Sequence, residues 1–342
     1  MVSFFSDIAA LNSAFVAALK PYGAVFVLVD ENTSKHCLPL ISALVPDSLP
    51  IEVQSGEEHK NMWTCSLIWS VLTDHTADRK SLLVNLGGGV ITDMGGFAAS
   101  CYKRGIDFIN IPTTLLAMVD ASVGGKTGID FAGFKNQVGV FSEAKDVLIC
   151  PEFLKTLDAR QLRSGMAEVL KHSLIADGPA FIRYSASTAI SLEIIRKAID
   201  IKSSIVAQDP FEKNVRKKLN FGHSVGHALE SYSLTTAEVL LHGEAVAYGM
   251  AIETYISALK SLIAKDKAEF VSQKLGSYFA LKPLSPEATD GLMSYLLQDK
   301  KNENGQIRMS LIDDIGSCLI DVLVTLDEVR RAIAQFNKDM GS

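Results

Sequence analysis

The chain has 342 residues, of which 48% are hydrophobic and 21% charged, and its formal net charge is -6 at pH 7. This is the composition of a folded globular protein, and the length exceeds the usual ceiling for one hydrophobic core, so we expect two domains. The acidic balance argues against a nucleic-acid-binding protein, and the absence of a long apolar run argues against association with a membrane.

The N-terminal segment and the cysteines indicate the compartment. Residues 1–20 lack a basic start and carry Asp7 before most of their apolar residues, which predicts an amphipathic helix rather than a signal peptide. The five cysteines are odd in number and form no C-x-x-C pair, which argues against a disulfide framework or a thiolate zinc site. We therefore expect a cytoplasmic protein.

The pattern of apolar residues changes along the chain. Short apolar runs at 24–30, 82–86 and 108–112 are separated by helix-length segments, which is typical of a parallel sheet covered by helices. After Pro151 apolar residues recur at three-to-four spacing, as in 190–205, which predicts helices. The fold class is therefore α/β, with a Rossmann-like nucleotide-binding domain over 1–152 followed by an all-α domain over 153–342.

A glycine-rich turn, GGGVITDMGGF at 87–97, follows the apolar run 82–86. Glycines at such a turn let the backbone approach a pyrophosphate, which the N–H groups at a helix start stabilise. The spacing differs from the usual G-x-G-x-x-G, and a tight turn with close helix packing is the alternative interpretation.

Polar residues follow the first predicted strand and precede the second. Asp30 and Asn32 come at the carboxyl end of the first strand, where an open α/β sheet binds its ligands. Glu57 and Lys60 would add a second carboxylate and a cation, although each residue alone is also typical of a solvated loop. The segment 112–128, PTTLLAMVDASVGGKTG, concentrates hydroxyls, a carboxylate, paired glycines and a lysine, which favours a functional loop.

The second half contains candidate metal ligands. His223 and His227 are four residues apart, which on a helix places them on one face, and His242 follows within twenty residues. With Glu168 upstream, these residues offer the nitrogen and oxygen ligands that zinc takes in open catalytic sites. The alternative is that same-face histidines only line a helix interface.

Several cations accompany these ligands in the sequence. Arg suits a planar two-oxygen group and Lys a point contact, so together they could bind a ligand that carries both phosphate and carboxylate. Without the other motifs most of them would be interpreted as surface charges. The candidates are Lys126, Lys135, Lys171, Lys202, Arg216, Lys300 and Lys301.

Six segments carry a resemblance to a known family: GGGVITDMGGFAA, INIPTTLLAMVDASVGGKTGID, KNQVG, GMAEVLKH, LNFGHSVGHALE and LHGEAVAYGM. In these segments the chain resembles the 3-dehydroquinate synthases, which belong to the sugar phosphate cyclases, and the resemblance runs from about residue 25 to 316. It implies conversion of 3-deoxy-D-arabino-heptulosonate 7-phosphate into 3-dehydroquinate and phosphate in the shikimate pathway. It also implies NAD that is reduced and reoxidised within one turnover, a zinc or cobalt ion, and a homodimer.

The resemblance assigns roles to individual residues. The implied metal ligands are Glu168, His223 and His242. The implied nucleotide contacts are Asp30, Asn32, Glu57, Lys60, Gly88, Gly89, Val90, Asp93, Thr113, Thr114, Asp120, Lys126, Lys135, Thr156 and Leu157. The implied substrate and catalytic residues are Asp120, Lys126, Asn136, Lys171, Lys202, Glu212, Arg216, Asn220, His227, one or both of Lys300 and Lys301, and Arg104 reaching the phosphate from the neighbouring subunit.

Two departures from the family pattern are visible. Gln161 stands where the family usually has a glutamate, so the contact at that position loses its charge. The segment 231–241 is slightly longer than usual, which affects the loop before His242 and removes no ligand.

Three other functions remain as alternatives. A cyclase of secondary metabolism would act on a sugar phosphate without a carboxylate, and Arg216 and Asn220 argue against it. A metal-dependent polyol or glycerol-phosphate dehydrogenase would consume NAD, and the strings GGKTG and AEVLKH favour the cyclase. A catalytically silent binding protein would bind ligand without releasing phosphate, but every expected metal-ligand position is filled.

Overall fold

The computed structural model describes residues 1–42, 48–132, 134–187, 189–298 and 306–341. The chain divides into two compact units, which are Met1–Leu162 with Ser191–Ile199 and Arg163–Ile190 with Asp200–Ser342. The domain boundary after residue 152 stays a prediction.

The first unit is built on a six-stranded sheet in the order β1-β8-β5-β4-β2-β3, in which every neighbouring pair is parallel. Every residue of the central strand β4 is buried, as expected for a strand covered on both faces. The predicted parallel α/β sheet is thus confirmed. The strands are β1 (Val2–Phe4), β2 (Ala24–Asp30), β3 (Leu49–Val53), β4 (Ser81–Gly87), β5 (Asp107–Pro112) and β8 (Asp146–Ile149).

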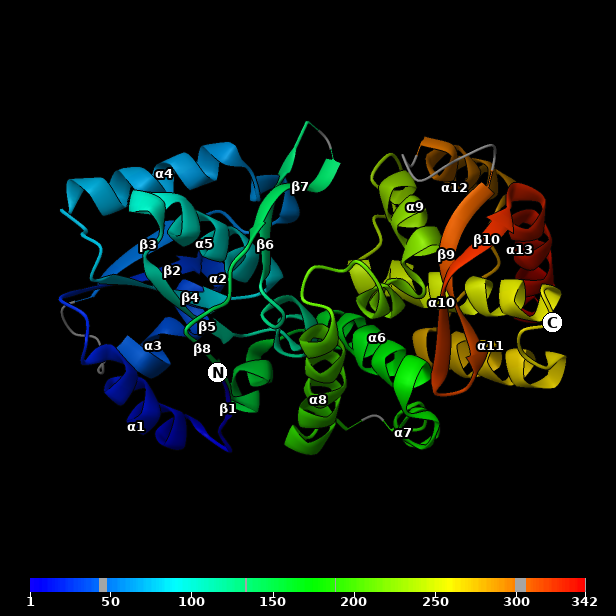
Figure 1. Ribbon diagram of the computed structural model, residues 1–342, viewed down its shortest axis with the longest axis horizontal. Helices are drawn as coiled ribbons and strands as arrows, with labels where there is room; N and C mark the ends of the chain where they lie inside the picture. Colours follow the sequence, from blue (N-terminus) through cyan, green and yellow to red (C-terminus); the bar gives the residue numbers. More distant parts are fainter. Residues whose placement is uncertain (43–47, 133, 188, 299–305, 342) are drawn as a thin grey trace. The chain divides into compact units, whose positions relative to one another are not determined.

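Helices cover both faces of this sheet, with α4 and α5 on one face and α1 and α3 on the other (Figure 1). The helical segments are α1 (Ile8–Leu19), α2 (Glu31–His36), α3 (Leu38–Ile41), η2 (Glu57–His59), α4 (Met62–Asp74), α5 (Gly89–Cys101), η3 (Tyr102–Arg104), the π-helical η4 (Ala117–Ala121) and η5 (Pro151–Thr156). The first predicted helix is present as α1, which is capped by Asp7 and buries Leu11 and Phe15. A separate antiparallel pair, β6 (Lys126–Phe131) and β7 (Phe134–Phe141), completes the unit.

Two glycines let helix α5 pack tightly in this unit. A Cβ atom added at Gly95 would lie 2.0 Å from Oδ1 of Asn85, and one added at Gly96 would lie 2.5 Å from Cγ2 of Thr127. Real Cβ atoms do not approach other atoms so closely, so larger residues would push the helix away. The glycines therefore let the middle of α5 pack closely on β4 and β6.

The second unit is mainly helical. Its helices are α6 (Ala159–Ala176), α7 (Gly178–Tyr184), α8 (Leu192–Gln208), η6 (Val215–Asn220), α9 (His223–Ser233), α10 (His242–Leu259), α11 (Lys265–Phe279), α12 (Pro286–Gln298) and α13 (Leu326–Met340), of which α6 and α8 begin within the first unit. Helix α10 is buried over most of its length and packs against α9, α11 and α13. The helical character predicted for this part is confirmed.

An antiparallel hairpin of β9 (Gln306–Asp314) and β10 (Ser317–Thr325) is an addition that the sequence analysis did not predict. Gly316 makes its turn with a φ of 100°, a conformation that glycine adopts without steric cost.

Among the described residues, no helix combines the length and the apolar character needed to cross a bilayer.

Candidate functional site

Three predicted metal ligands from three helices meet in the second unit. Oε1 of Glu168, on α6, lies 3.7 Å from Nε2 of His223 at the start of α9 and 3.8 Å from Nε2 of His242 at the start of α10. Ligands that each lie about 2.0–2.2 Å from a tetrahedral zinc ion are roughly 3.3–3.6 Å from one another. The two distances from Oε1 of Glu168 exceed that spacing by only a few tenths of an ångström, so this oxygen could share an ion with either imidazole after a small adjustment.

The carboxylate of Glu168 is suited to such a site. Its side chain is fully buried, and no described group donates a well-formed hydrogen bond to either of its oxygens. Oε2 contacts the ammonium group of Lys171, which is also buried, whereas Oε1 faces the two imidazoles. A buried carboxylate needs compensating positive charge, which Lys171 provides in part and a divalent cation would complete.

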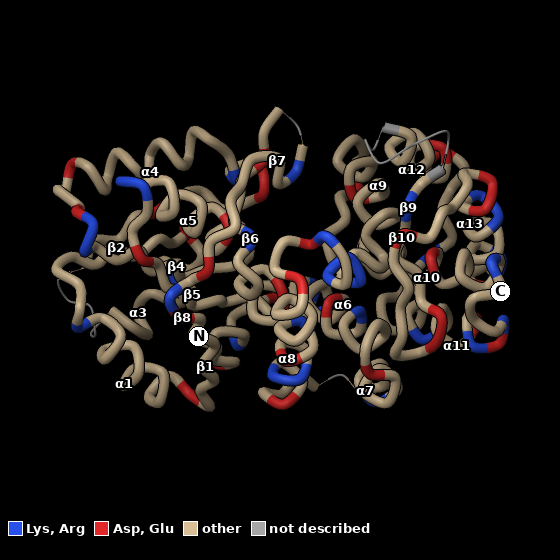
Figure 2. The backbone as a smooth tube through the Cα atoms, viewed as in Figure 1, with Lys and Arg blue, Asp and Glu red and all other residues tan. Residues whose placement is uncertain are grey.

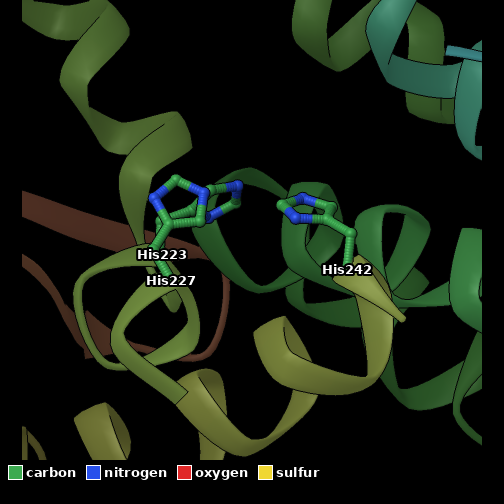
Figure 3. Close-up of side chains that lie close together, drawn as sticks. All are labelled: His223, His227 and His242. Atoms are coloured by element: carbon green, nitrogen blue, oxygen red, sulfur yellow. The ribbon is translucent and has the colours of Figure 1, made fainter. Parts of the chain in front are cut away.

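His227 joins the same group. Figure 3 shows the rings of His223 and His227, which both come from α9, turned toward the ring of His242. The ring centroids of His223 and His227 are 5.0 Å apart, and a nitrogen of each of the three imidazoles lies within 4.8 Å of the others. The structure thus offers a second possible donor set, in which His227 replaces Glu168.

Close helix packing brings these ligands together. A Cβ atom at Gly243, next to His242, would lie 1.9 Å from the carbonyl oxygen of Ser164, which is one turn before Glu168 on α6. A Cβ atom at Gly249 on α10 would lie 1.9 Å from the carbonyl oxygen of Gly222, next to His223. Backbone contact at two glycines therefore fixes α10 against both other ligand-bearing segments.

The two histidines are oriented by different partners. Nδ1 of His242 lies 3.3 Å from Oε2 of Glu230, which is buried on α9, whereas Nδ1 of His223 lies 3.2 Å from the carbonyl oxygen of Phe221. Burial, together with the positive charges of Lys171 and the neighbouring histidines, holds the pKa of His223 well below its ordinary value of 6.5. Both arrangements leave Nε2 turned toward Glu168, and a neutral imidazole is the form that binds a metal.

Sequence reasoning assigned no role to Glu230 or to Glu253 of α10. Glu230 follows His223 by seven residues, so the two share a helix face, and that spacing was an available signal. Glu253 is a single acidic residue in the otherwise apolar stretch of α10, which is typical of a paired buried carboxylate. Burial raises the pKa of Glu253 to about 8, although hydrogen bonds from the backbone of residues 222, 224 and 225 lower it.

Three predicted substrate residues lie in one segment of the second unit. Nδ2 of Asn220 donates to Oε1 of Glu212 over 2.7 Å, and the side chain of Arg216 is buried and donates to the carbonyl oxygen of Pro210. Asp209, which sequence reasoning did not single out, accepts backbone N–H bonds from residues 213, 214 and 216. One carboxylate thus organises the loop that carries these residues.

Cations gather in this unit. Lys171 and Lys202 are buried, with 1% and 6% of their surfaces exposed, and Figure 2 shows several Lys and Arg positions beside α6. A buried cation is costly unless an anion accompanies it, and Glu168 provides that anion for Lys171.

In the first unit, three residues predicted to bind the nucleotide, Asp30, Thr113 and Thr114, lie at the same sheet edge as the glycine turn. Asp30, Gly87 and Pro112 end the adjacent strands β2, β4 and β5, so Gly88 and Thr113 follow at the same edge of the sheet. Gly88 precedes the first residue of α5, and Thr114 lies close enough that a Cβ atom at Gly88 would be 3.0 Å from its Cγ2. The first turn of a helix has N–H groups without intrahelical acceptors, so α5 offers an anion-binding end here.

Many of the side chains predicted to contact the nucleotide bind other protein groups. Asp30 caps α2 by accepting the N–H of Thr33, and Oγ1 of Thr114 accepts the N–H of Ala117. Nζ of Lys60 is 2.7 Å from both Oδ2 of Asp93 and Oδ1 of Asn136.

Glu57 completes this network through its carboxylate. Its Oε1 is 3.9 Å from Nζ of Lys60 and 3.8 Å from Nζ of Lys135. Although burial alone would lower it, the carboxylates of Asp93 and Glu57 raise the pKa of Lys60 above its ordinary value. Lys60 is therefore a charged, buried cross-link between the segments that carry these residues.

The other predicted residues are spread over several segments of the chain. Asn32 is exposed on α2, Arg104 is exposed in a turn with a φ of 67°, and Thr156 and Leu157 lie at the end of η5. Gly89 and Val90 begin α5, Asp120 lies half-buried in η4, and Lys126 begins β6. Gln161 donates its backbone N–H to Asp158 at the start of α6, whereas Lys300 and Lys301 lie outside the described residues.

Comparison with known proteins gives a consistent result. The family model for the 3-dehydroquinate synthase N-terminal domain matches residues 50–164, and that for the C-terminal domain matches residues 165–302. The 3-dehydroquinate synthase of Parabacteroides distasonis is 39% identical over 338 residues, covering 96% of this chain and 95% of that protein. The 2-epi-valiolone synthase of Actinosynnema mirum is 38% identical over 295 residues, covering 83% of this chain and 77% of that protein.

A solved structure agrees with these matches. ValA, the 2-epi-5-epi-valiolone synthase of Streptomyces hygroscopicus, was solved with NAD+ and Zn2+ bound and superimposes with a TM-score of 0.84. It is 27% identical, and the match covers 99% of this chain and 96% of that one. The chain belongs to the 3-dehydroquinate synthase family of enzymes, within the sugar phosphate cyclase superfamily.

Proposed function

We propose that this protein is a 3-dehydroquinate synthase that uses NAD and a divalent metal ion, zinc or cobalt. It converts 3-deoxy-D-arabino-heptulosonate 7-phosphate into 3-dehydroquinate and phosphate, the second step of the shikimate pathway. The observation that carries this proposal is the convergence of Glu168, His223 and His242 in a member of this family. The NAD+ and Zn2+ bound to the related ValA support the choice of cofactors.

The two bound groups supply chemistry that side chains lack. NAD takes up and returns a hydride, and the divalent ion acts as a Lewis acid toward the substrate. The protein residues hold these groups and the substrate in place, which is a positioning effect. The ammonium group of Lys171 contacts Oε2 of Glu168, whereas Oε1 faces the imidazoles of His223 and His242, where a metal ion would bind.

The substrate is a doubly acidic sugar, so its binding requires buried positive charge. Lys171, Lys202 and Arg216 provide this charge in the second unit, and the planar guanidinium of Arg216 suits a carboxylate. His227, exposed beside the two histidine ligands, is placed to orient a substrate hydroxyl. Asp120, Lys126, Asn136, Glu212 and Asn220 complete the proposed substrate set.

The nucleotide-binding role falls to the first unit. The N-terminal end of α5, with Gly88 and Gly89, provides backbone N–H groups for the pyrophosphate of NAD. Asp30 ends β2 at the same sheet edge and is the proposed partner of a ribose hydroxyl. Lys60 and its partners Glu57 and Asp93 are further proposed nucleotide-binding residues, which are linked to one another by ion pairs.

The test is a direct assay of the reaction. Purified protein is incubated with the heptulosonate phosphate, NAD and zinc, while phosphate release, product identity and absorbance at the nicotinamide band are followed. The proposal predicts 3-dehydroquinate and phosphate in equal amounts with no steady change in absorbance. Accumulation of NADH would instead indicate the dehydrogenase, and ligand binding without phosphate release would indicate a silent binding protein.

A second candidate function is a cyclase that acts on a sugar phosphate without a carboxylate. The 38% identity to a 2-epi-valiolone synthase favours it, because that value is close to the 39% identity to a 3-dehydroquinate synthase. A parallel assay with a seven-carbon sugar phosphate that lacks the carboxylate decides between them. Turnover of that sugar in preference to the acid would make the second candidate the function.

We also propose a homodimer in which Arg104 reaches the phosphate bound to the neighbouring subunit. Its exposure in a strained left-handed turn after α5 supports a role outside its own subunit. Mixing the inactive variants Arg104→Ala and His242→Ala should restore about a quarter of the wild-type activity, because half of the dimers gain one complete site. No recovery after subunit exchange would contradict the shared site.

We also propose a cytoplasmic location. All five cysteines are free thiols, which supports it.

A further inference from the structure

The imidazole of His223 is oriented by a different kind of partner from that of His242. His242 faces a carboxylate directly through Nδ1, but Nδ1 of His223 faces the backbone carbonyl of Phe221. A backbone carbonyl is a weaker acceptor than a carboxylate and moves with its peptide plane. Something must therefore hold the peptide between Phe221 and Gly222 in the orientation that His223 requires.

The side chain of Glu253 binds that same peptide group from its other side. Its Oε2 accepts the N–H of Gly222 over 2.6 Å, and its Oε1 accepts the N–H of Val225 over 3.0 Å. The N–H of Gly222 and the C=O of Phe221 belong to one peptide unit. Hydrogen bonds thus run from Glu253 through this peptide to Nδ1 of His223.

The hydrogen bonds from the backbone to Glu253 are buried, so no other group can easily replace its side chain as the acceptor. Glu253 is fully buried, and the backbone of Gly222 packs so closely on Gly249 that a Cβ atom there would lie 1.9 Å from the Gly222 carbonyl oxygen. Little room remains for water to replace the carboxylate as acceptor. Its two oxygens also lie at the N-terminal end of α9, where they accept N–H groups that have no acceptor within the helix.

We propose that Glu253 is a positioning residue for the metal centre, which orients His223 through the peptide between Phe221 and Gly222. The inference rests on the proposed role of His223 as a metal ligand. The carboxylate fixes the plane of the peptide and, by binding its N–H, makes its carbonyl a better acceptor for Nδ1–H. His223 is then held in the tautomer whose Nε2 is the free acceptor, facing Oε1 of Glu168.

The variant Glu253→Gln tests the proposal because it keeps the shape of the side chain. Its amide nitrogen would face a backbone N–H, so one of the two hydrogen bonds is lost. The matched control is Thr254→Val, since Thr254 is the next residue, is equally buried and donates its hydroxyl to Met250 of its own helix. Zinc affinity of the metal-free proteins is measured by competition with a coloured chelator, and helix content by circular dichroism.

We expect zinc affinity to fall about 10- to 100-fold in Glu253→Gln, with unchanged helix content, and to stay at the wild-type value in Thr254→Val. Equal affinity in Glu253→Gln and wild type would overturn the proposal. Failure of the wild type to bind zinc at these residues would instead overturn the proposed function, and this inference with it.

A measurement on the unaltered protein covers the case in which the variant does not fold. Nitrogen-15 NMR of the histidine rings in the metal-free wild type reports which ring nitrogen carries the proton. The proposal requires the Nδ1–H tautomer at His223 near neutral pH. An Nε2–H tautomer there would contradict it.

Discussion

In the proposed metal centre, Oε1 of Glu168 faces the imidazoles of His223 and His242, whereas in the proposed nucleotide region Asp30, Lys60 and other side chains predicted to bind NAD already bind protein groups. The proposed metal centre consists of side chains that are held in place by close backbone packing of helices. The proposed nucleotide region consists of backbone at the end of a strand, and the side chains around it bind one another.

The contrast follows from what each site must bind. A metal ion needs several donor atoms at about 2 Å, which only specific side chains provide. A pyrophosphate is bound well by backbone N–H groups at a helix start, so residue type there matters mostly for shape. Polar residues around a glycine turn can therefore belong to the frame of a nucleotide site without contacting the nucleotide.

The largest effect is expected from His242→Ala, which removes a ligand from the convergent site. Metal content and turnover should both fall to background, because Glu168 and His223 alone leave two protein ligands. Metal analysis and the phosphate-release assay check this. His227→Ala is the control and should retain zinc, and a metal-free His242→Ala protein with full activity would refute the ligand assignment.

The variant Lys60→Met tests whether the nucleotide region is a frame of paired side chains. Removing a cation that is 4% exposed breaks a buried ion pair with Asp93, so the free energy of unfolding should fall by about 3 kcal/mol. Urea denaturation measures this change. Lys135→Met, which removes a more exposed cation 3.8 Å from Glu57, should cost less than about 1 kcal/mol.

The outcome of the Lys60 test separates two roles. A Lys60→Met protein with wild-type stability but without NAD affinity would show that Lys60 is a direct nucleotide ligand. Lys60 would then bind the nucleotide itself and would not only cross-link the side chains around it.

A smaller effect is expected from Glu230→Gln, which weakens the partner of His242 and keeps all three proposed ligands. Zinc affinity should fall about 10- to 100-fold, as is typical when the carboxylate behind a metal-binding histidine is altered. Competition with a chelator measures it. Unchanged affinity would mean that helix packing alone orients His242.

The smallest effect is expected from Asp209→Asn and concerns acid stability. Burial opposes ionisation, but three backbone N–H donors and the charge of Arg216 together lower the pKa of Asp209 below its ordinary value of 3.8. Its contribution to stability is therefore complete above pH 3.8 and is lost as the pH falls through the folded-state pKa. The melting temperature of Asp209→Asn should lie below that of the wild type at pH 7, and the gap should narrow below about pH 4. A gap that is constant with pH would contradict this.

Local patterns predicted much of the fold. The apolar runs that became β2, β4 and β5 and the glycine turn before α5 are visible because strand and turn signals are local in sequence. The hairpin of β9 and β10 was missed because the three-to-four spacing of the second half was extended to its end. Alternating apolar residues before Gly316 and a mostly apolar run after it were the available signal.

The site was harder to predict, because its contacts join distant parts of the sequence. Residue types and family resemblance grouped Glu168, His223 and His242, and the structure brings these three together. The bond between Lys60 and Asn136 spans 76 residues, and that between Glu253 and Gly222 depends on how closely two helices pack. Neither has a signature in local spacing, because each depends on tertiary packing.

X-ray absorption at the zinc edge of the zinc-loaded protein distinguishes the two possible donor sets. If Glu168, His223 and His242 hold the ion, we expect one zinc per chain, bound by two imidazole nitrogens and a carboxylate oxygen at about 2.0–2.2 Å. Three imidazoles, which would mean that His227 replaces Glu168, or any sulfur ligand, would contradict it.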